Sequence, residues 1–600
     1  MTRSRHRPPS TRTRRVLERA TVFGRRVTGL CLVASHLALA GCGGGEPTAD
    51  IVFAIHDEHR RFDPQEISWV MDSRIADCLY EPLLRVNPAD LSLEPGVAGL
   101  PDVSDDGLTY RFSLRDDARW SDGTPVTSHD FRFAWRRALL PDMAADYTQL
   151  LFCIEGAKAF FEYRQEALDR FATEHADAPD PKAAEALWTQ ALERFDETVG
   201  IKAPDDRTLV VRLAQRTPYF DELVAFVTFM PVPKTVVSKL TSIDAESGMM
   251  RKDAGYWSDP ARLVSNGPYI LKRRRFRRDL LLEANPHYWD RAAMRNGSIL
   301  EKIISEHQTA LLYYQNGSVN WLPDLPTASP LAADLVAQNR PDVHLQPMAG
   351  VYFYNFNCKP TLPDGTPNPL ADRRVRRALS MAVDRKTIVE QVTRLHQPVA
   401  TTFVPPGVLP GYDPPTESGI HFDTEAARKL LAEAGYEDGA TLIGLSVLYN
   451  TGHGHETIAQ AIKRMWKQHL GVSVELEGVE VRSFGDRLKK QDYAISRAGW
   501  FGDYRDPTTW LEKMETGNGN NDCAYSNAEY DAVLRDAAVE PSPERRLEIL
   551  RQAEAIMLED APMAIIFQYL SLYVYDPANL KGMTPNAWNA WRLDRVEVAP

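Results

Sequence analysis

The sequence predicts an α/β protein with more than one domain. A chain of 600 residues is too long for one hydrophobic core, because single cores stop growing beyond about 250–300 residues. Its apolar share of 44% and charged share of 25% are those of a globular chain. From Ile51 onward, stretches with the two-residue period of strands alternate with stretches of helical spacing, a pattern typical of α/β folds.

Residues 1–41 are predicted to be an export signal. An arginine-rich start is followed by a short apolar stretch at 27–40 and then by Leu-Ala-Gly-Cys, which ends at Cys42. A basic region, a short apolar region and small residues before the cleavage point define a signal peptide. The ending resembles the motif of bacterial lipoproteins, in which the cysteine is lipidated. We therefore expect a lipid on Cys42, a tether at 42–50 and a periplasmic (extracytoplasmic) protein anchored to a membrane.

Several elements follow from local patterns in the first half of the chain. Asp105-Asp106-Gly107 predicts a turn before a strand that buries Tyr110, Phe112 and Leu114. Thr127 and Asp130 have the spacing of a capping box and predict a helix that begins there. Thr208–Leu213 predicts a further strand.

Three helices are predicted in the second half from their apolar spacing. Val375–Ala382 is the first, and Ala427–Ala434 with Gly435 at its end is the second. The third is the apolar stripe Ile458–Leu470, which Gly471 ends, and the sequence after it predicts a strand with Val472, Val474 and Leu476 on one face.

Two charged segments differ from the rest. Residues 157–198 are rich in alanine and charge at helical spacing and predict a surface helical hairpin. The run Arg273-Arg274-Arg275 with Arg277-Arg278 lies between two strand-like stretches and predicts a solvated β-hairpin, with contact to anionic lipid as the alternative.

Known catalytic and cofactor motifs do not occur in the sequence. It has no phosphate-binding loop, dinucleotide fingerprint, zinc-protease motif or nucleophile elbow, so we expect no enzyme activity and no cofactor. The net charge of −12 disfavours nucleic acid as a partner. His453-Gly454-His455-Glu456 is weak as a metal motif, and we expect no metal site. The spacing of Cys78, Cys153, Cys358 and Cys523 leaves both disulfides and single buried thiols open.

The stretch RAGWFGDYRDP at 497–507 has features of a ligand site. It places the carboxylate of Asp503 after Trp500 and Phe501 and beside Gly499 and Gly502. Glycines allow close backbone approach, aromatic faces can enclose a small ligand, and a fixed negative charge suits an ammonium group. The alternative is a turn whose aspartate is structural.

Many stretches from residue 51 to about 595 resemble one family, the extracellular solute-binding proteins of bacterial peptide ABC importers. These oligopeptide- and dipeptide-binding lipoproteins are similar to the chain over the long block VSDDGLTYRFSLRDDARWSDGTPVTSHDFRFAWRR at 103–137. The shorter stretches are LYEPL at 79–83, DDRTLVVRL at 205–213, SNGPYIL at 265–271, NPHYWD at 285–290, VRRALSMAVDR at 375–385, KLLAEAGY at 429–436 and RAGWFGDYRDP.

The resemblance implies a two-lobed periplasmic-binding-protein fold with an extra domain inserted in the first lobe. Hinges would join the lobes, which close around the ligand. The implied segments are residues 51–70, 207–349 and 565–600 for lobe I, 71–206 for the extra domain and 350–564 for lobe II.

The resemblance also implies the ligand-binding residues. Asp503 matches the aspartate that holds a peptide's α-ammonium, and Gly499, Trp500 and Phe501 match the strand beside the peptide. The other matching positions are Ser68, Trp69 and Val70 on the opposite side, Tyr147 in the site wall, and Arg497, His455 and Asn355 towards the peptide C-terminus, Asn355 in place of an acidic residue.

The implied function is that of a lipid-anchored, monomeric peptide-binding protein. It would capture short peptides and deliver them to an ABC permease and its ATPase subunits. Two alternatives remain: the same fold could bind a nickel chelate, haem or a sugar, or could serve as a sensor or chaperone without transport. Asp503 favours peptides, because a buried carboxylate needs a cationic partner.

Overall fold

The computed structural model describes residues 49–599 except 177, 328 and 453. The predicted signal peptide, Cys42, most of the predicted tether and His453 lie outside the described residues. Across the described residues, helices and strands alternate along the chain, which confirms the predicted α/β class.

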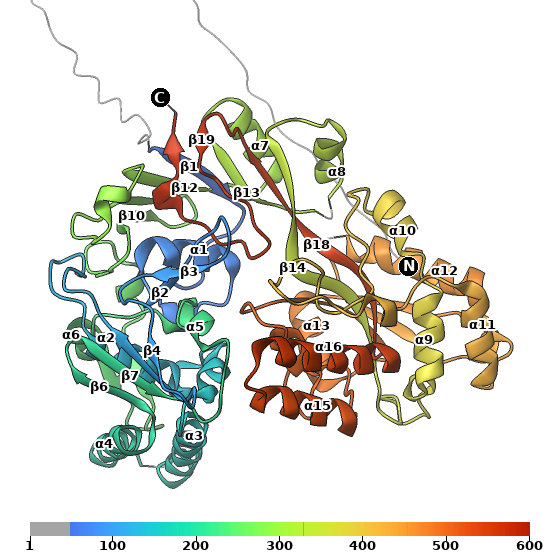
Figure 1. The fold of residues 1–600 in the computed structure, drawn as a ribbon, viewed down its shortest axis with the longest axis horizontal. Helices are drawn as coiled ribbons and strands as arrows, with labels where there is room; N and C mark the ends of the chain where they lie inside the picture. The colour runs from blue at the N-terminus through green and yellow to red at the C-terminus, as the bar shows by residue number, and fades with distance from the viewer. Residues whose placement is uncertain (1–48, 177, 328, 453, 600) are drawn as a thin grey trace, which may run out of the picture. The chain divides into compact units, whose positions relative to one another are not determined.

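A mixed ten-stranded sheet is the largest element of the described chain (Figure 1). β1 lies inside it, parallel to β12 and β13, and buries Ile51, Phe53 and Ile55 on one face and Ala54 on the other. Such continuous burial is typical of a parallel strand covered on both faces. In spatial order the strands are β10 (Tyr269–Arg275), β11 (Asp279–Ala284), β12 (Ser298–Ile303), β1 (Ile51–Ile55), β13 (Trp321–Leu325), β18 (Met563–Tyr575), β14 (Val343–Phe356), β17 (Ile495–Phe501), β15 (Ser446–Asn450) and β16 (Glu475–Val479).

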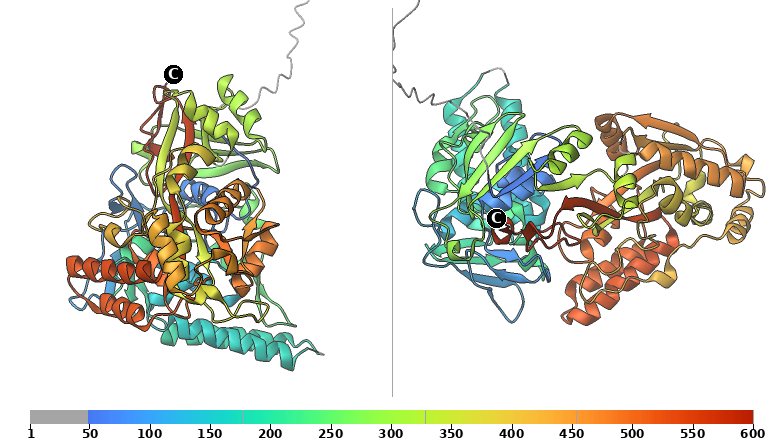
Figure 2. Two further views of the ribbon diagram at one scale, coloured as in Figure 1. Left: turned by 90° about the vertical axis from the view of Figure 1, so that its right-hand side faces the viewer. Right: turned by 90° about the horizontal axis from the view of Figure 1, so that it is seen from above.

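β14 and β18 carry the chain between two lobes (Figures 1 and 2). They pair with each other in two stretches, and the register shifts between Pro347 and Val351. On one side of this shift β18 pairs with β13, and on the other β14 pairs with β17. Hinges are a few residues that absorb a change in backbone direction, so this irregularity is where we expect the lobes to move. The predicted lobe boundary at 349/350 falls inside it, and the boundaries stay predictions.

A second, four-stranded sheet lies in the first part of the chain. Its strand order is β4 (Asp102–Val103), β5 (Thr109–Ser113), β7 (Thr208–Arg212) and β6 (Ile201–Asp205). The predicted strands are confirmed, with Tyr110 and Phe112 buried on one face and Gly107 at a φ of 67° in the turn before β5. β7 therefore hydrogen-bonds to strands on the other side of the predicted boundary at 206/207.

The predicted helices are present, and the three in the second half of the chain begin two or three residues before their predicted apolar stripes. The capping box of Thr127 and Asp130 opens α2 (Ser128–Ala138). α9 (Arg373–Met381), α11 (Thr424–Glu433) and α12 (His455–Leu470) follow in the second lobe. The glycines beyond α11 and α12 have φ angles of 92° and 76°, which residues with a side chain rarely adopt.

The strand predicted from Val472 onward is wrong at its start, because β16 begins at Glu475. The N–H of Val472 donates to the carbonyl of Trp466 at 3.2 Å and closes the end of α12. That bond uses the donor that a sheet ladder would need. Val472 and Val474 are buried in the core of the second lobe without belonging to the strand.

Both charged segments form the predicted hairpins. α3 (Ala157–Glu174) and α4 (Pro181–Thr198) pack together at the end of the first lobe farthest from the large sheet (Figure 1). A fully buried ion pair of 2.7 Å between Arg164 and Asp142 ties α3 to the domain. The arginine run forms the end of β10 and the turn to β11. Arg273 contacts Asp279 at 3.2 Å, and Arg274 contacts Glu58 at 2.9 Å. These arginines are thus partly paired with acids rather than only solvated.

All four cysteines of the described chain are free thiols. Two of them, Cys358 and Cys523, are neighbours, since the N–H of Cys358 donates to the carbonyl of Cys523 at 2.8 Å. The two thiols also interact, which lowers the pKa of Cys358 and raises that of Cys523.

Candidate functional site

A cavity of about 650 Å³ lies between the segments of the two lobes. Its volume is in the range of sites that enclose small organic ligands. Most of its lining comes from four parts of the chain, and Asn520 adds to them. The four parts are α1 (Val70–Leu79) with the residues before and after it, residues 146–149 with 222–227, the end of β17 with the loop to residue 505, and residues 588–592 near the C-terminus.

Asp503 faces this cavity from the loop after β17. Its carboxylate accepts a hydrogen bond of 3.0 Å from the hydroxyl of Tyr147, and its backbone N–H donates to Thr509 at 2.9 Å. Burial raises the pKa of Asp503 to about 6, against the lowering effect of the Tyr147 bond. No cation of the described chain lies at ion-pair distance from this carboxylate, so its charge is available to a ligand.

Other contacts between the lobes surround this hydrogen bond. Arg505 forms an ion pair with Glu222, and the ring of Tyr504 stacks on that of Tyr219 with 4.3 Å between centroids. The loop that carries Asp503 is therefore held against the first lobe on both sides.

The strand before Asp503 offers an unpaired edge. β17 pairs with β14 along its whole length, but β15 pairs only with Ile495 and Ser496 of β17. In the described sheet, residues 497–501 therefore have no strand partner on the edge away from β14. An extended peptide could add to this edge through main-chain hydrogen bonds.

The aromatic residues of β17 form part of the wall. Phe501 is 44% exposed and stacks on Tyr569 with 4.7 Å between ring centroids. Trp500 is held by a hydrogen bond of 2.7 Å from its ring N–H to the carbonyl of Thr509.

Gly499 and Gly502 are required by the protein's own packing. A Cβ atom on Gly499 would meet the hydroxyl of Tyr569 at 2.5 Å, and one on Gly502 would meet Trp510 at 2.5 Å. Real Cβ atoms do not come that close, so a side chain at either position would displace these rings.

Ser68, Trp69 and Val70 approach the site from the first lobe, at the start of α1. Trp69 is 50% exposed and Val70 is 53% exposed, and the hydroxyl of Ser68 donates to Asp146 at 2.6 Å. Ser68 and Val70 line the cavity, whereas Trp69 packs under the guanidinium of Arg60, 3.9 Å from the ring centre, and does not line it.

Arg497 and His455 lie together on the second lobe, although neither lines the cavity. The guanidinium of Arg497 lies 5.2 Å from the centre of the Tyr352 ring, and the Nδ1 atom of His455 lies 3.3 Å from the Tyr352 hydroxyl. Arg497 also donates to Tyr569 at 3.0 Å. Asn355 is 1% exposed in β14 and is not brought to the cavity.

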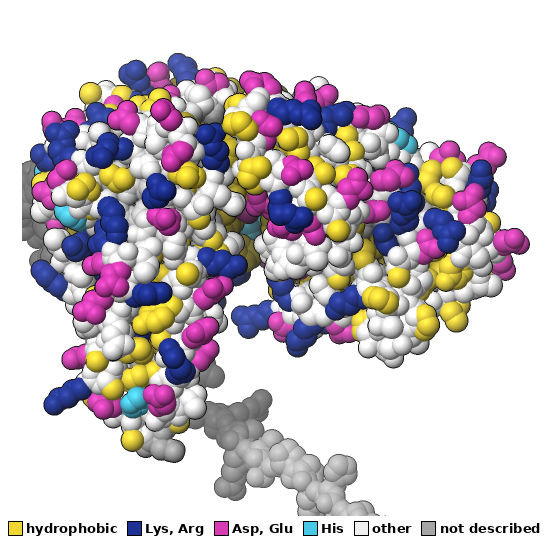
Figure 3. Space-filling view, turned by 60° about the horizontal axis from the view of Figure 1, so that its bottom comes forward, with side chains coloured by type: hydrophobic (Ala, Val, Ile, Leu, Met, Phe, Trp, Pro, Cys, Tyr) yellow, Lys and Arg dark blue, Asp and Glu magenta, His cyan; other side chains and the backbone are white. Residues whose placement is uncertain are grey.

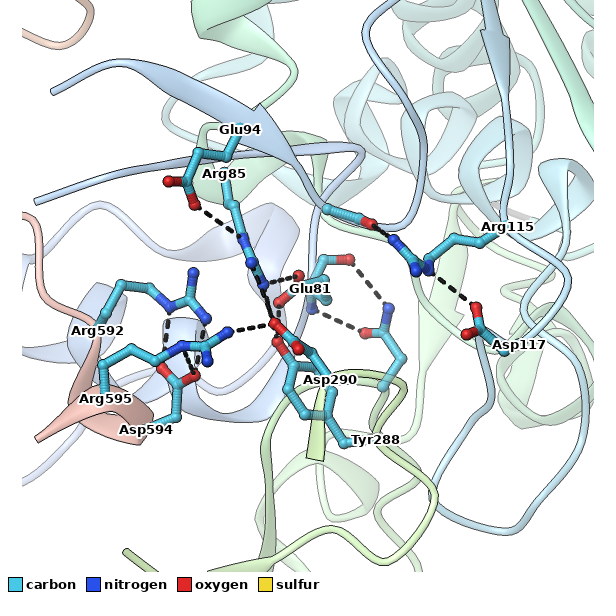
Figure 4. A network of polar contacts seen from close by, with 12 residues as sticks. Glu81, Arg85, Glu94, Arg115, Asp117, Tyr288, Asp290, Arg592, Asp594 and Arg595 are labelled. Carbon is cyan, nitrogen blue, oxygen red and sulfur yellow. Dashed lines mark hydrogen bonds and ion pairs between the residues drawn. The ribbon is translucent and has the colours of Figure 1, made fainter. Parts of the chain in front are cut away.

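A network of polar contacts lies at the far end of α1, where Glu81, Arg85 and Arg592 line the cavity (Figure 4). Arg85 contacts Glu81 at 3.3 Å and Asp290 at 3.2 Å, and Asp290 also pairs with Arg595 of the C-terminal segment. The hydroxyl of Tyr288 donates to Glu81 at 3.1 Å. These contacts fix the residues after α1 against the end of the chain.

The sequence did not predict this part of the cavity wall. One face of α1 lines the cavity wall, and the spacing of its residues along the sequence is that of a helix face. The sequence does not show that this face borders a cavity. The C-terminal lining residues carry no local signal. The lining residues that were not predicted, there and elsewhere in the wall, include Ser73, Arg74, Asp77, Glu81, Arg85, Glu222, Arg505 and residues 588–592.

The surface and the helices add two observations. Basic and acidic side chains are interspersed over the face in Figure 3. Among the helices that the structure describes, none combines the length and apolar character needed to cross a bilayer. The described residues also contain no group of three or more potential metal ligands, and His453 of the weak metal motif is outside that search.

Comparisons with known proteins identify the family. The family model of bacterial extracellular solute-binding proteins, family 5, matches residues 92–522. The oligopeptide-binding protein OppA of Bacillus subtilis is 34% identical to the chain over 516 residues, which cover 84% of each protein. A periplasmic oligopeptide-binding protein of Borrelia burgdorferi superimposes with a TM-score of 0.72 at 29% identity and covers 92% of this chain and 100% of its own.

A third relative, Haemophilus influenzae OppA in complex with the peptide RPPGFSPFR, has a TM-score of 0.69 at 28% identity over 91% of this chain and 98% of its own. These likenesses confirm the two-lobed periplasmic-binding-protein fold. The chain belongs to the bacterial extracellular solute-binding proteins of family 5.

Proposed function

We propose that this chain is the peptide-binding component of an ABC importer, which captures short peptides between its lobes and delivers them to the permease. The observation that carries the proposal is the carboxylate of Asp503, which faces the cavity with a phenol as partner and no cation of the described chain beside it. A buried charge without a partner is costly, and the α-ammonium of a peptide would neutralise it. Relatives named as oligopeptide-binding proteins support the same ligand class.

The peptide would bind as an added strand. The unpaired edge of β17 at residues 497–501 supplies main-chain groups from the second lobe, and Ser68–Val70 would supply them from the first. Main-chain pairing gives affinity with little dependence on side chains. The protein acts in this account by binding and closure, not by catalysis.

The peptide carboxylate would go to Arg497 and His455. Arg497 is surrounded by the phenols of Tyr352 and Tyr569 and has no carboxylate at ion-pair distance among the described residues. Its Nε–H is buried without a hydrogen-bond partner. Asn355 would lie behind this pair, in the next strand, rather than contact the ligand.

The ligand class is tested by calorimetry with defined peptides. Tri-alanine should bind and raise the melting temperature, because a ligand that binds only the native state stabilises it by mass action. It should also reduce the radius of gyration if the lobes close around it. Nickel ions, haem and maltose serve as comparison ligands. A melting shift with one of these and none with peptides would contradict the proposal.

Membrane attachment is a separate part of the proposal. We propose that a lipid on Cys42 anchors the protein at the extracytoplasmic face of a membrane and that the protein acts as a monomer. Cys42→Ala removes the proposed lipidation site and should abolish incorporation of labelled fatty acid. Because stable anchoring depends on two or more acyl chains, the variant should also be released from membranes. Full membrane retention of the variant would contradict the anchor and leave peptide binding untouched.

A further inference from the structure

The charged residues of the cavity are paired, with few exceptions. Each of the four arginines that line it has a carboxylate partner within the described chain. Two of the partners are outside the cavity: Arg74 is bound to Asp324 by two hydrogen bonds of 2.8 and 2.9 Å, and Arg592 is bound to Asp594 at 2.7 Å. The pairs inside it are Arg85 with Glu81 and Arg505 with Glu222.

Three carboxylates of the lining therefore have no cationic partner at ion-pair distance in the part of the chain that the structure describes. Asp503 is bonded to Tyr147, and Asp146 to the hydroxyl of Ser68. The third, Asp77, is exposed to the cavity and makes neither a hydrogen bond nor an ion pair with a described residue. The lining as a whole thus carries a surplus of negative charge, which attracts cationic ligands into a cleft.

Asp77 lies on the face of α1 that lines the cavity. Val70, Ser73, Arg74 and Asp77 follow the i, i+3, i+4, i+7 spacing of one helix face, so α1 runs along the wall with Asp77 about 10 Å from Val70. Its side chain stays exposed to the cavity, and the charges that act on its carboxyl are those of Glu81, Arg592 and Arg74. Both of these arginines are bound to other carboxylates, so neither neutralises Asp77.

We propose that Asp77 is the specificity-determining residue of a subsite for a cationic side chain, so that the protein prefers peptides containing lysine or arginine. This inference rests on the proposed function and names its substrate class more narrowly. The peptide backbone beside Ser68–Val70 would lie about 5 Å from that segment, as neighbouring strands do. A short side chain ends near Val70, whereas the four-carbon stem of lysine carries its ammonium along α1 towards Asp77.

The experiment compares lysine with norleucine, which has the same four-carbon stem without the charge. Ala-Lys-Ala, Ala-Ala-Lys and the two norleucine peptides are titrated by calorimetry at pH 8, where Asp77 is ionised. At one of the two positions the wild-type protein should bind lysine about tenfold more tightly than norleucine, as expected for a charge-assisted hydrogen bond. Asp77→Asn should abolish this preference, and tri-alanine, which has no side chain that reaches Asp77, should still bind.

Asp146→Asn is the matched control, because Asp146 is a second carboxylate of the lining without a cationic partner at ion-pair distance. It should keep the preference for lysine. Loss of the preference in Asp146→Asn but not in Asp77→Asn would overturn the assignment to Asp77. Equal binding of lysine and norleucine peptides at both positions by the wild-type protein would overturn the subsite, while binding of tri-alanine would keep the proposed function. Absence of binding by every peptide would overturn the proposed function and the subsite with it.

Discussion

The hydroxyl of Tyr147 donates a 3.0 Å hydrogen bond to the carboxylate of Asp503, 356 residues further along the chain. Tyr147 belongs to the part of the chain before the first crossing between the lobes, and Asp503 follows β17 of the second. This single bond orients the carboxylate that we propose to hold a peptide's α-ammonium. It also makes the site depend on both lobes.

Tyr147→Phe tests the orienting role. The variant keeps the ring and its edge-on contact with Phe226, 4.9 Å between centroids, but removes the donor. Since the bond lowers the pKa of Asp503, its loss should raise that pKa further above its ordinary value. Affinity for tri-alanine at pH 7 should fall about tenfold, the scale of a hydrogen bond to a charged group. Calorimetry over a pH series checks both effects, and an unchanged affinity and pH midpoint would show that Tyr147 does not act on Asp503.

Peptide affinity should have a maximum between about pH 6 and pH 8. The pairing needs an ionised Asp503, whose pKa is raised to about 6, and a protonated α-amine, whose ordinary pKa is about 7.7–8.0. Affinity therefore falls below pH 6 as the carboxyl takes up a proton, and above pH 8 as the amine loses one. Asp503→Asn should remove the fall in affinity below pH 6, and the affinity of this variant should change little with pH. A fall with the same midpoint in the variant would assign it to another group.

Local signals predicted much of the fold. The capping box of Thr127 and the glycine after α12 each act within a few residues, so the sequence contains the whole of their physical cause. The start of β16 was missed because the N–H of Val472 serves the end of the preceding helix, a competition that apolar alternation does not reveal.

The site residues could be predicted only where they belong to a contiguous sequence motif. Asp503 and its neighbours form one contiguous stretch with a recognisable composition, and the structure places them around the cavity. Asp77 and residues 588–592 meet across about five hundred positions of sequence, and only the fold brings them together. Gly499 was predicted to let a ligand come close to the backbone. In the structure its missing side chain makes room for the hydroxyl of Tyr569, a contact that the local sequence does not show.

Cys358 and Cys523 should form a disulfide when an oxidant is supplied. Their backbones share a hydrogen bond of 2.8 Å and their thiols interact, so the two segments lie side by side at these positions, as a disulfide requires. Diamide, an azo oxidant, takes two electrons and two protons from the thiol pair and leaves one S–S bond. The oxidised protein should be about 2–4 kcal/mol more stable, because the bond closes a long loop.

Peptide mapping by mass spectrometry identifies that bond. A linked peptide with both cysteines is expected from the oxidised protein, with Cys78 and Cys153 still alkylated as free thiols. Cys358→Ser should abolish the link and the gain in stability. Alkylation of all four thiols after diamide treatment would contradict the pairing.

The central claim, that Asp503 holds the α-ammonium of a peptide, is tested most directly by a double-mutant cycle. The four combinations are wild type and Asp503→Asn, each titrated with tri-alanine and with N-acetyl-tri-alanine at pH 7. Loss of one member of a buried charge pair costs about 3–5 kcal/mol. Since about 1.4 kcal/mol corresponds to a tenfold change in affinity, Asp503→Asn should weaken binding of the free peptide by roughly two to three orders of magnitude. The variant should hardly change the binding of the acetylated peptide, which leaves the wild-type carboxylate without a partner. The account predicts a coupling energy of at least about 2 kcal/mol, and a coupling below about 0.5 kcal/mol, the limit of additivity for independent sites, would contradict it.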